Sequence, residues 1–232
     1  EVEGVYPVRI AYPASTTSQL LERDDLPAGS AVRARLGLPG YSGRGVTIAL
    51  IDTGVQHAHD YLAGAVLEGV DILENDDLAS ARANPDEPSE LERHGTQLAG
   101  LVVGSGGPGG LTGLAENATL LPIRVAGWQR DVTGRWAVYS RTDQLIAGLE
   151  RAVDPDRNGD AHDAARVTLV PLSEPFSAFP DSPLSQAVAG AVALGSVHPV
   201  ALGLQLIYPV GFAAVAIAGE RQRGTLEVLL SR

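Results

Sequence analysis

The sequence predicts an α/β protein in which a mostly parallel sheet carries helices on both faces. Three observations lead to this prediction. Nearly continuous apolar, β-branched segments recur along the chain, and such segments are typical of strands buried on both faces. Segments with the composition of helices lie between them. Strands that alternate with helices in this way pair in parallel, because each helix carries the chain back across the sheet.

Three segments are predicted to be strands of this sheet. Residues 46–52 run Val-Thr-Ile-Ala-Leu-Ile into Asp52, which favours a central strand over an alternating surface strand. Residues 118–125 have the same apolar composition. Residues 167–172 form the third strand, although Pro171 within it cannot donate a hydrogen bond to a neighbouring strand.

Helices are predicted at residues 94–104, 142–153 and about 183–194. The first is rich in small residues, so it can pack closely against the sheet. The second is amphipathic, and Thr142 can cap it. A shorter helix is expected at 30–38, within a lead-in segment of residues 1–39. Residues 71–93 are acidic and are predicted to form a surface loop.

The composition excludes several classes of protein. A formal net charge of -11 argues against a nucleic-acid partner, because phosphates need clustered Lys and Arg. The absence of cysteine removes disulfides, thiolate metal sites and thiol catalysis together. The chain begins at Glu1 and contains no methionine, so we expect a mature form, an excised segment or a fragment.

Asp52 and His94 are the candidate catalytic residues. Asp52 ends the first strand, and open α/β sheets place their sites at the carboxyl ends of strands. A simple turn at Asp-Thr-Gly is the alternative interpretation of this residue. The stretch His94-Gly95-Thr96 favours catalysis, because a carboxylate that orients an imidazole supplies two members of a Ser, His and Asp triad.

The stretches around these two residues resemble the subtilase family of serine proteases. They are Ile51 to Gly54, His94 to Gly100, Gly113 to Val125 and Pro183 to Val188. The resemblance covers residues 40–200 and implies a subtilisin-like three-layer fold. It also implies a serine endopeptidase that hydrolyses polypeptide substrates, with Asp52 as the triad aspartate and His94 as the general base.

The same resemblance implies that Pro171, Leu172 and Ser173 lie on the strand that pairs with an extended substrate. Two motifs of the family are missing. No Gly-Thr-Ser, the nucleophile motif, occurs in the 232 residues, and Leu204 stands where the oxyanion asparagine is expected. We therefore expect a subtilase-like domain that is incomplete at its carboxyl-terminal end and inactive as it stands.

An acidic loop is a candidate calcium site. Side-chain oxygens recur at mostly alternate positions around a glycine, the arrangement by which a tight loop wraps Ca²⁺. The candidate ligands are Asp154, Asp156, Asn158, Asp160 and Asp163. Members of the subtilase family commonly hold calcium in loops, which favours this interpretation. A solvated acidic turn is the alternative, because Ala165 stands where an EF-hand loop supplies its bidentate carboxylate.

Residues 201–232 differ in composition from the rest of the chain. Residues 202–219 are apolar and precede a basic edge, which fits either a transmembrane helix or a buried core helix. The segment after them resembles one that follows a transmembrane helix in ABC-type permease subunits. This resemblance implies membrane association and an extracytoplasmic or secreted, membrane-anchored protease-like part.

Two alternatives to a truncated protease domain follow from this tail. One is a non-catalytic, subtilase-like module of a membrane transport protein of the ABC permease type. The other is an artificial junction near residues 197–204, which would explain the same abrupt change of composition.

Overall fold

In the computed structural model, a parallel sheet lies at the centre of the described part of the chain. The structure describes residues 5–14, 37, 40–62, 64–107, 110–175, 181–194, 200–201 and 217–218. The sheet has the strand order β3-β4-β2-β7, and all its neighbours are parallel. Its strands are β3 (Val70–Asp71), β4 (Thr119–Arg124), β2 (Thr47–Asp52) and β7 (Val167–Leu169). The predicted parallel sheet is confirmed.

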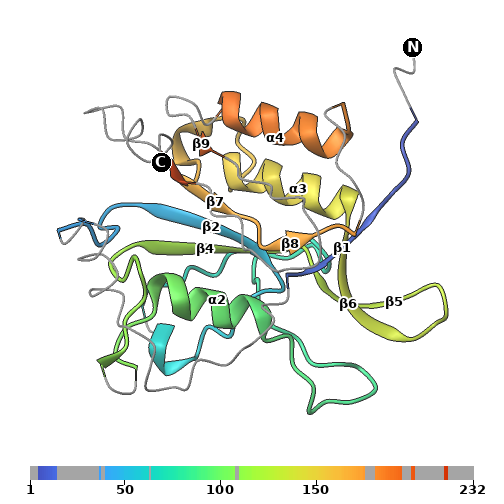
Figure 1. Cartoon of the computed structure of the whole chain (residues 1–232), viewed down its shortest axis with the longest axis horizontal. Helices are drawn as coiled ribbons and strands as arrows, with labels where there is room; N and C mark the ends of the chain where they lie inside the picture. Colours follow the sequence, from blue (N-terminus) through green and yellow to red (C-terminus); the bar gives the residue numbers. More distant parts are fainter. Residues whose placement is uncertain are drawn as a thin grey trace.

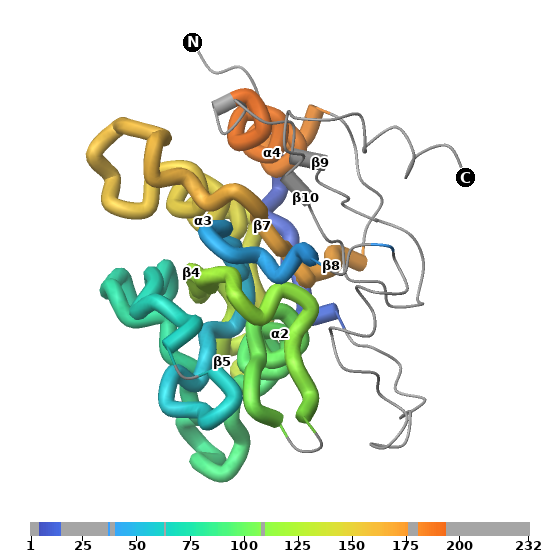
Figure 2. The backbone as a smooth tube through the Cα atoms, turned by 90° about the vertical axis from the view of Figure 1, so that its left-hand side faces the viewer, coloured from blue at the N-terminus to red at the C-terminus, as the bar shows by residue number. Residues whose placement is uncertain are grey.

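Helices cover both faces of this sheet (Figure 1, Figure 2). The helices are α2 (His94–Val103) on one face, and α3 (Thr142–Val153) and α4 (Pro183–Leu194) on the other. Two short 3₁₀ turns are formed by Asp60–Leu62 and Ala161–Asp163. Side chains of β2 alternate between two apolar cores: Ile48 and Leu50 pack toward α2, while Ala49 and Ile51 pack toward α3. The three-layer α/β arrangement is therefore confirmed.

A second sheet is antiparallel and was not predicted. Its strands, in the order β5-β6-β1-β8, are β5 (Gly127–Arg130), β6 (Trp136–Arg141), β1 (Ile10–Pro13) and β8 (Leu172–Ser173). β5 and β6 form a hairpin that projects from the molecule in Figure 1. β1 comes from the lead-in segment, so this segment contributes a strand to the fold.

The single strand predicted at residues 167–172 is in fact two strands. β7 ends at Leu169 and pairs with β2, whereas β8 begins at Leu172 and pairs with β1. Pro171 lies between them and has no N–H, so a continuous ladder would lose a hydrogen bond at this residue. The chain passes from one sheet to the other at this point.

The predictions for the two ends of the chain fall mainly outside the described residues. The helix expected at 30–38 lies there apart from Gly37, as do residues 202–216 of the expected apolar helix. Ile217–Ala218 forms strand β10, which pairs antiparallel with β9 (Val200–Ala201), so helix is the wrong prediction for these two residues. Within the part of the chain that the structure describes, no helix is long and apolar enough to cross a membrane.

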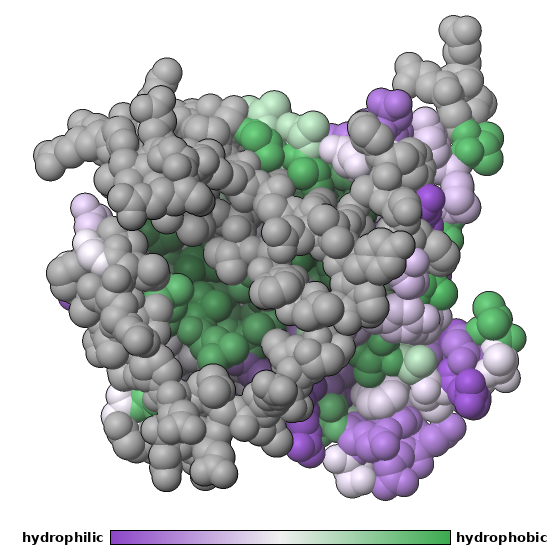
Figure 3. Space-filling view, in the orientation of Figure 1, coloured by the Kyte–Doolittle hydropathy of each residue, from purple (hydrophilic) through white to green (hydrophobic). Residues whose placement is uncertain are grey.

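The tip of the loop between β3 and α2 is hydrophilic surface. Hydrophilic side chains gather over this loop and the β5–β6 hairpin in Figure 3. Residues 85–90 are exposed. Asn84 closes the tip, because its N donates to Glu90 O at 2.7 Å and its Nδ2 donates to Glu90 Oε2 at 2.8 Å.

Gly148→Ala is expected to destabilise the fold. Gly148 faces the sheet from α3, and a Cβ at this position would lie 2.5 Å from Val125 Cγ1 and 3.2 Å from Ile51 Cγ2. These branched side chains are fully buried, so overpacking should lower the free energy of unfolding by about 1–3 kcal/mol, measured by urea denaturation.

Gly100→Ala is the matched control for this prediction. Gly100 also lies inside a helix, but a Cβ there meets nothing within 4 Å. Alanine should therefore raise the free energy of unfolding by up to about 1 kcal/mol through its helix propensity. Equal changes in the two variants would contradict the close approach of α3 to the sheet.

Candidate active site

Asp52 is held at the carboxyl end of β2. Its side chain is fully buried, and its Oδ1 accepts a hydrogen bond from Thr53 N at 2.6 Å. Its backbone carbonyl accepts from Val125 N at 2.9 Å and from Ala126 N at 3.2 Å, just beyond the end of β4. Contacts to the neighbouring strand therefore fix the backbone of Asp52 independently of any histidine.

His94 is the first residue of α2, which docks on the turn after β2. Gly95 N donates a hydrogen bond to Thr53 Oγ1 at 3.0 Å. A Cβ on Gly95 would overlap the carbonyl oxygen of Gly54, so the helix can approach the turn this closely only with glycine there. The two sequence motifs thus form one structural unit.

The side chains of Asp52 and His94 meet in this unit. His94 Nδ1 lies 2.9 Å from Asp52 Oδ1 and 2.8 Å from Asp52 Oδ2. The opposite nitrogen, Nε2, lies 3.1 Å from the carbonyl oxygen of Ala14. Because oxygen acceptors face both nitrogens, the arrangement suits a doubly protonated imidazolium.

The pKa of His94 is raised above its ordinary value. Burial alone would lower this pKa, but the hydrogen bond with Asp52, the negative charge of Asp52 and the carbonyl of Ala14 together outweigh burial. An imidazole whose protonated form is stabilised in this way is chemically equipped to accept a proton from a neighbouring hydroxyl.

An extended segment of the chain lies beside this pair and leads to it. β1 pairs antiparallel with β8 in the register Tyr12 to Ser173 and Pro13 to Leu172. One residue further on, Ala14 N donates to Pro171 O at 3.0 Å. Pro171 has no N–H to return to Ala14 O, which instead faces His94 Nε2. The structure thus places an extended backbone along all three residues predicted to bind substrate.

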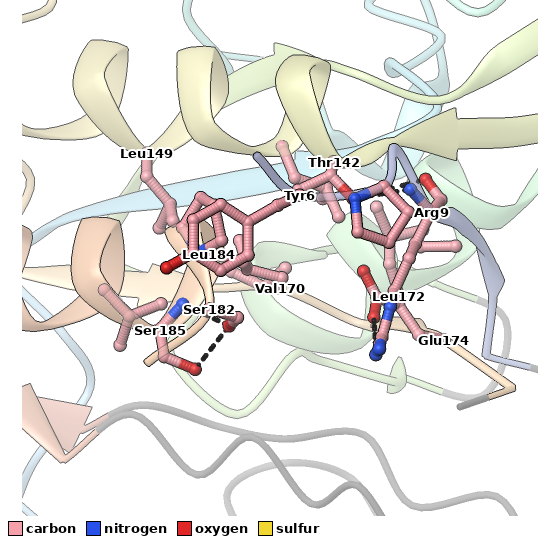
Figure 4. Close-up of a pocket in the computed structure, with 15 residues that line it drawn as sticks. Tyr6, Arg9, Thr142, Leu149, Val170, Leu172, Glu174, Ser182, Leu184 and Ser185 are labelled. Atoms are coloured by element: carbon pink, nitrogen blue, oxygen red, sulfur yellow. Dashed lines mark hydrogen bonds and ion pairs between the residues drawn. The ribbon is translucent and has the colours of Figure 1, made fainter. Parts of the chain in front are cut away.

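Contacts further upstream anchor the same segment beside an apolar pocket (Figure 4). Arg9 N donates to Thr142 Oγ1 and Thr142 N donates to Arg9 O, both at 3.0 Å. Arg9 Nη1 lies 3.7 Å from Glu174 Oε2. Burial raises the pKa of Glu174, while the charge of Arg9 acts in the opposite direction. Tyr6 and Leu184 lie together at the other end of the pocket in Figure 4.

This strand was not predicted from the sequence. Residues 1–39 were expected to be a lead-in without a sustained pattern, although Val-Tyr-Pro-Val-Arg-Ile-Ala-Tyr at 5–12 is rich in residues that favour strands. That composition was the available signal. The partner strand could not be identified from it, because β8 lies about 160 residues later in the chain.

The structure brings together three of the five candidate calcium ligands. Carboxylate oxygens of Asp154, Asp156 and Asp163 all lie within 4.8 Å of one another. Asn158 and Asp160 instead make hydrogen bonds inside the loop: Asn158 Nδ2 donates to Asp156 Oδ2 at 2.8 Å, and Asp160 Oδ1 accepts from His162 N at 3.0 Å. Burial and the neighbouring carboxylates raise the pKa of Asp163.

Comparison with known proteins finds relatives for the part of the chain that forms this site. Residues 43–169 match the subtilase family. The minor extracellular protease Vpr of Bacillus subtilis is 37% identical over 116 residues, which are 49% of this chain and 13% of Vpr. The major intracellular serine protease of the same species is 26% identical over 144 residues, which are 61% of this chain and 41% of that protein.

One solved structure of a protease is also similar to part of this chain. A protease from Pseudoalteromonas arctica is 26% identical, with 67% of this chain and 48% of that chain covered and a TM-score of 0.47. The chain therefore spans less than half the length of the relatives named here. The family match covers more than half of the 232 residues and includes both Asp52 and His94. This chain belongs to the subtilase family of serine proteases.

Proposed function

We propose that the chain is the part of a serine endopeptidase that supplies the aspartate and histidine of an Asp/His/Ser triad and the strand that binds the polypeptide substrate. The antiparallel pairing of β1 with β8, which leads to a carbonyl 3.1 Å from His94 Nε2, carries this proposal. A polypeptide substrate must lie extended beside the general base, and β1 occupies such a place in an extended conformation.

In this proposal Asp52 and His94 act on a serine hydroxyl. Asp52 holds Nδ1–H of the neutral His94, so that Nε2, once the Ala14 carbonyl has left it, takes the hydroxyl proton and later returns it to the leaving amine. Asp52 also stabilises the imidazolium that forms between these two steps. No Gly-Thr-Ser occurs in the 232 residues, so the chain as it stands should bind polypeptide without hydrolysing it.

The substrate class follows from the way β8 makes its contacts. Pro171 O accepts a hydrogen bond from a backbone N–H, which any residue except proline can supply. Recognition through the main chain gives loose sequence specificity. An extracytoplasmic location is part of the proposal, and the extracellular relative Vpr supports it, although another relative is intracellular by name.

We also propose that Asp154, Asp156 and Asp163 hold a structural Ca²⁺. Three carboxylates that converge within 4.8 Å repel one another, and a hard divalent cation with oxygen ligands relieves this repulsion. Bound calcium would link the end of α3, where Asp154 lies, to the 3₁₀ turn that precedes β7. Its contribution would be to stability, with no part in the proton transfers at His94.

Asp52→Asn should lower the pKa of His94 by about 1–3 units, because the amide keeps the shape of the carboxylate but loses its charge. Burial, which lowers this pKa, then dominates. An NMR titration of the histidine rings measures the change. His162, which pairs with Asp160 on the surface, is the internal control and should titrate as before. An unchanged His94 would contradict the proposed pair.

This pair also predicts how stability depends on pH. The folded pKa of His94 is raised, so its protonation stabilises the fold fully below the ordinary value of about 6.5. That contribution is lost as the pH rises through the folded pKa.

Ala11→Asp should increase binding of fluorescein-labelled, denatured casein to the full chain. Ala11 is 1% exposed in β1, so a buried carboxylate should displace this strand and free β8. We expect affinity, measured by fluorescence anisotropy, to rise by about tenfold, which is about 1.4 kcal/mol. Val8→Asp is the matched control, because Val8 is 62% exposed in the same segment.

Further measurements on the same samples complete the test. Adding Ser173→Pro to Ala11→Asp should abolish the gain, because proline removes a backbone donor from β8. No variant should hydrolyse casein or react with a fluorophosphonate probe. A folded Ala11→Asp variant without increased binding would contradict substrate pairing on β8, and labelling that His94→Ala removes would reveal a nucleophile.

Millimolar Ca²⁺ should raise the thermal midpoint of the full chain by about 3 °C or more relative to EDTA, if its concentration exceeds Kd a hundredfold. Asp156→Asn should abolish this rise, because it removes one of the three charges. Asp86→Asn is the control, since Asp86 is an exposed carboxylate in another loop. Equal midpoints in Ca²⁺ and EDTA would show that the loop is a solvated acidic turn.

A further inference from the structure

A fully buried arginine lies beside the Asp52–His94 pair. Arg124 ends β4 and is 2% exposed. Its Nε and Nη2 donate to Glu92 Oε2 and Oε1 at 2.9 and 2.7 Å, in a bidentate pair. Its Nη1 donates to Asp71 Oδ2 at 2.9 Å. Asp71 and Glu92 belong to the stretch predicted to form a surface loop, yet their side chains are fully buried. That prediction is wrong for these two residues.

The carboxylate of Glu92 has further partners. Trp128 N donates to Oε1 and Arg82 N donates to Oε2, both at 2.9 Å. A Cβ on Gly127 would overlap Arg124 Nη2 and lie 2.7 Å from Glu92 Oε1, so glycine lets the chain pass close to the pair. A buried carboxylate with four donors is fixed in position, because any movement would leave a desolvated charge without hydrogen bonds.

Glu92 lies two residues before His94, at the start of a helix that has no side-chain cap. Arg93 is the N-cap of α2 and makes no side-chain capping hydrogen bond. The start of the helix is instead held on two sides. Just after β2, Thr53 Oγ1 accepts a hydrogen bond from Gly95 N. At the end of β4, the Arg124 guanidinium binds the side chain of Glu92. Asp52 and Arg124 are register partners in the parallel sheet.

We propose that Glu92 and Arg124 are positioning residues for His94. Their bidentate pair fixes the approach to α2, so that the imidazole reaches both oxygens of Asp52. This inference rests on the proposed role of His94 as general base. In it, Glu92 and Arg124 act only by positioning His94 and touch neither the substrate nor the transferred proton.

Asp71 supplies a matched control on the same guanidinium. It is also fully buried and also binds Arg124. The other hydrogen bonds of its side chain are accepted from Leu73 N and Glu74 N, in the turn after β3, and its Oδ2 also lies 3.7 Å from Arg82 Nη2. Glu92→Gln and Asp71→Asn therefore remove the same charge from the same partner, but only Glu92→Gln loosens the approach to His94.

The test is an NMR titration of His94 in the full chain. Glu92→Gln should lower the pKa of His94 by about one unit, because a displaced imidazole loses part of its interaction with Asp52. It should also broaden the downfield Nδ1–H resonance. Asp71→Asn should lower the thermal midpoint while leaving both signals unchanged. Arg124→Lys keeps the charge but not the planar fork, so it should act like Glu92→Gln.

The outcomes distinguish a positioning role of Glu92 from an effect of its charge and from a loss of overall stability. An unchanged pKa in folded Glu92→Gln, or an equal fall in Asp71→Asn, would overturn the inference. If Glu92→Gln does not fold, the triple variant Glu92→Gln, Asp71→Asn, Arg124→Met removes all three charges at similar volume. An unchanged pKa in that variant would overturn the inference as well.

The titration of Asp52→Asn keeps this inference distinct from the proposed function. If Asp52→Asn lowers the pKa and Glu92→Gln does not, only the positioning role fails. If Asp52→Asn has no effect, the catalytic pair itself is refuted.

Discussion

The parallel register of β2 and β4 is the constraint on which the site depends. Asp52 and Arg124 are paired residues at the carboxyl ends of these strands. One side chain receives the imidazole, and the other holds the chain just before it. If β2 shifted by one residue in this register, each of its apolar side chains would face the opposite core, and Asp52 would point to the wrong face of the sheet. Burial of Ile48 to Ile51 on alternate sides therefore protects the geometry of the polar site.

The second sheet places an extended strand beside the Asp52–His94 pair. β1 lies between β6 and β8, so its backbone is held on both edges. Pro171 ends the ladder and leaves the carbonyl of Ala14 for His94. The same proline separates β7 from β8, which moves the chain from the parallel to the antiparallel sheet. One residue without an N–H therefore determines both the course of the chain and the polar environment of Nε2.

The elements predicted correctly are those whose signal is local. α3 spans 142–153 as predicted, because its apolar period lies within one short segment, but the predicted cap is wrong: Arg141 and not Thr142 is the N-cap. Asp52 and His94 were predicted from short motifs, and docking of Gly95 on the turn after β2 brings those two motifs together. Pairing of β1 with β8 and the contacts of Arg124 join residues far apart in the chain. No local pattern encodes such partners, and the charges of Asp71 and Glu92 suggested solvent exposure when seen without Arg124.

The loop that joins β3 to α2 has both of its ends on one guanidinium, since Asp71 and Glu92 bind the same Arg124. Its exposed tip is closed separately between Asn84 and Glu90. The length of the tip is therefore uncoupled from the position of His94, and each doubling of a flexible loop costs only about 0.6 kcal/mol in closure entropy. Insertions and substitutions in this tip can therefore be accommodated without moving His94, which leaves the tip free to vary in length and charge.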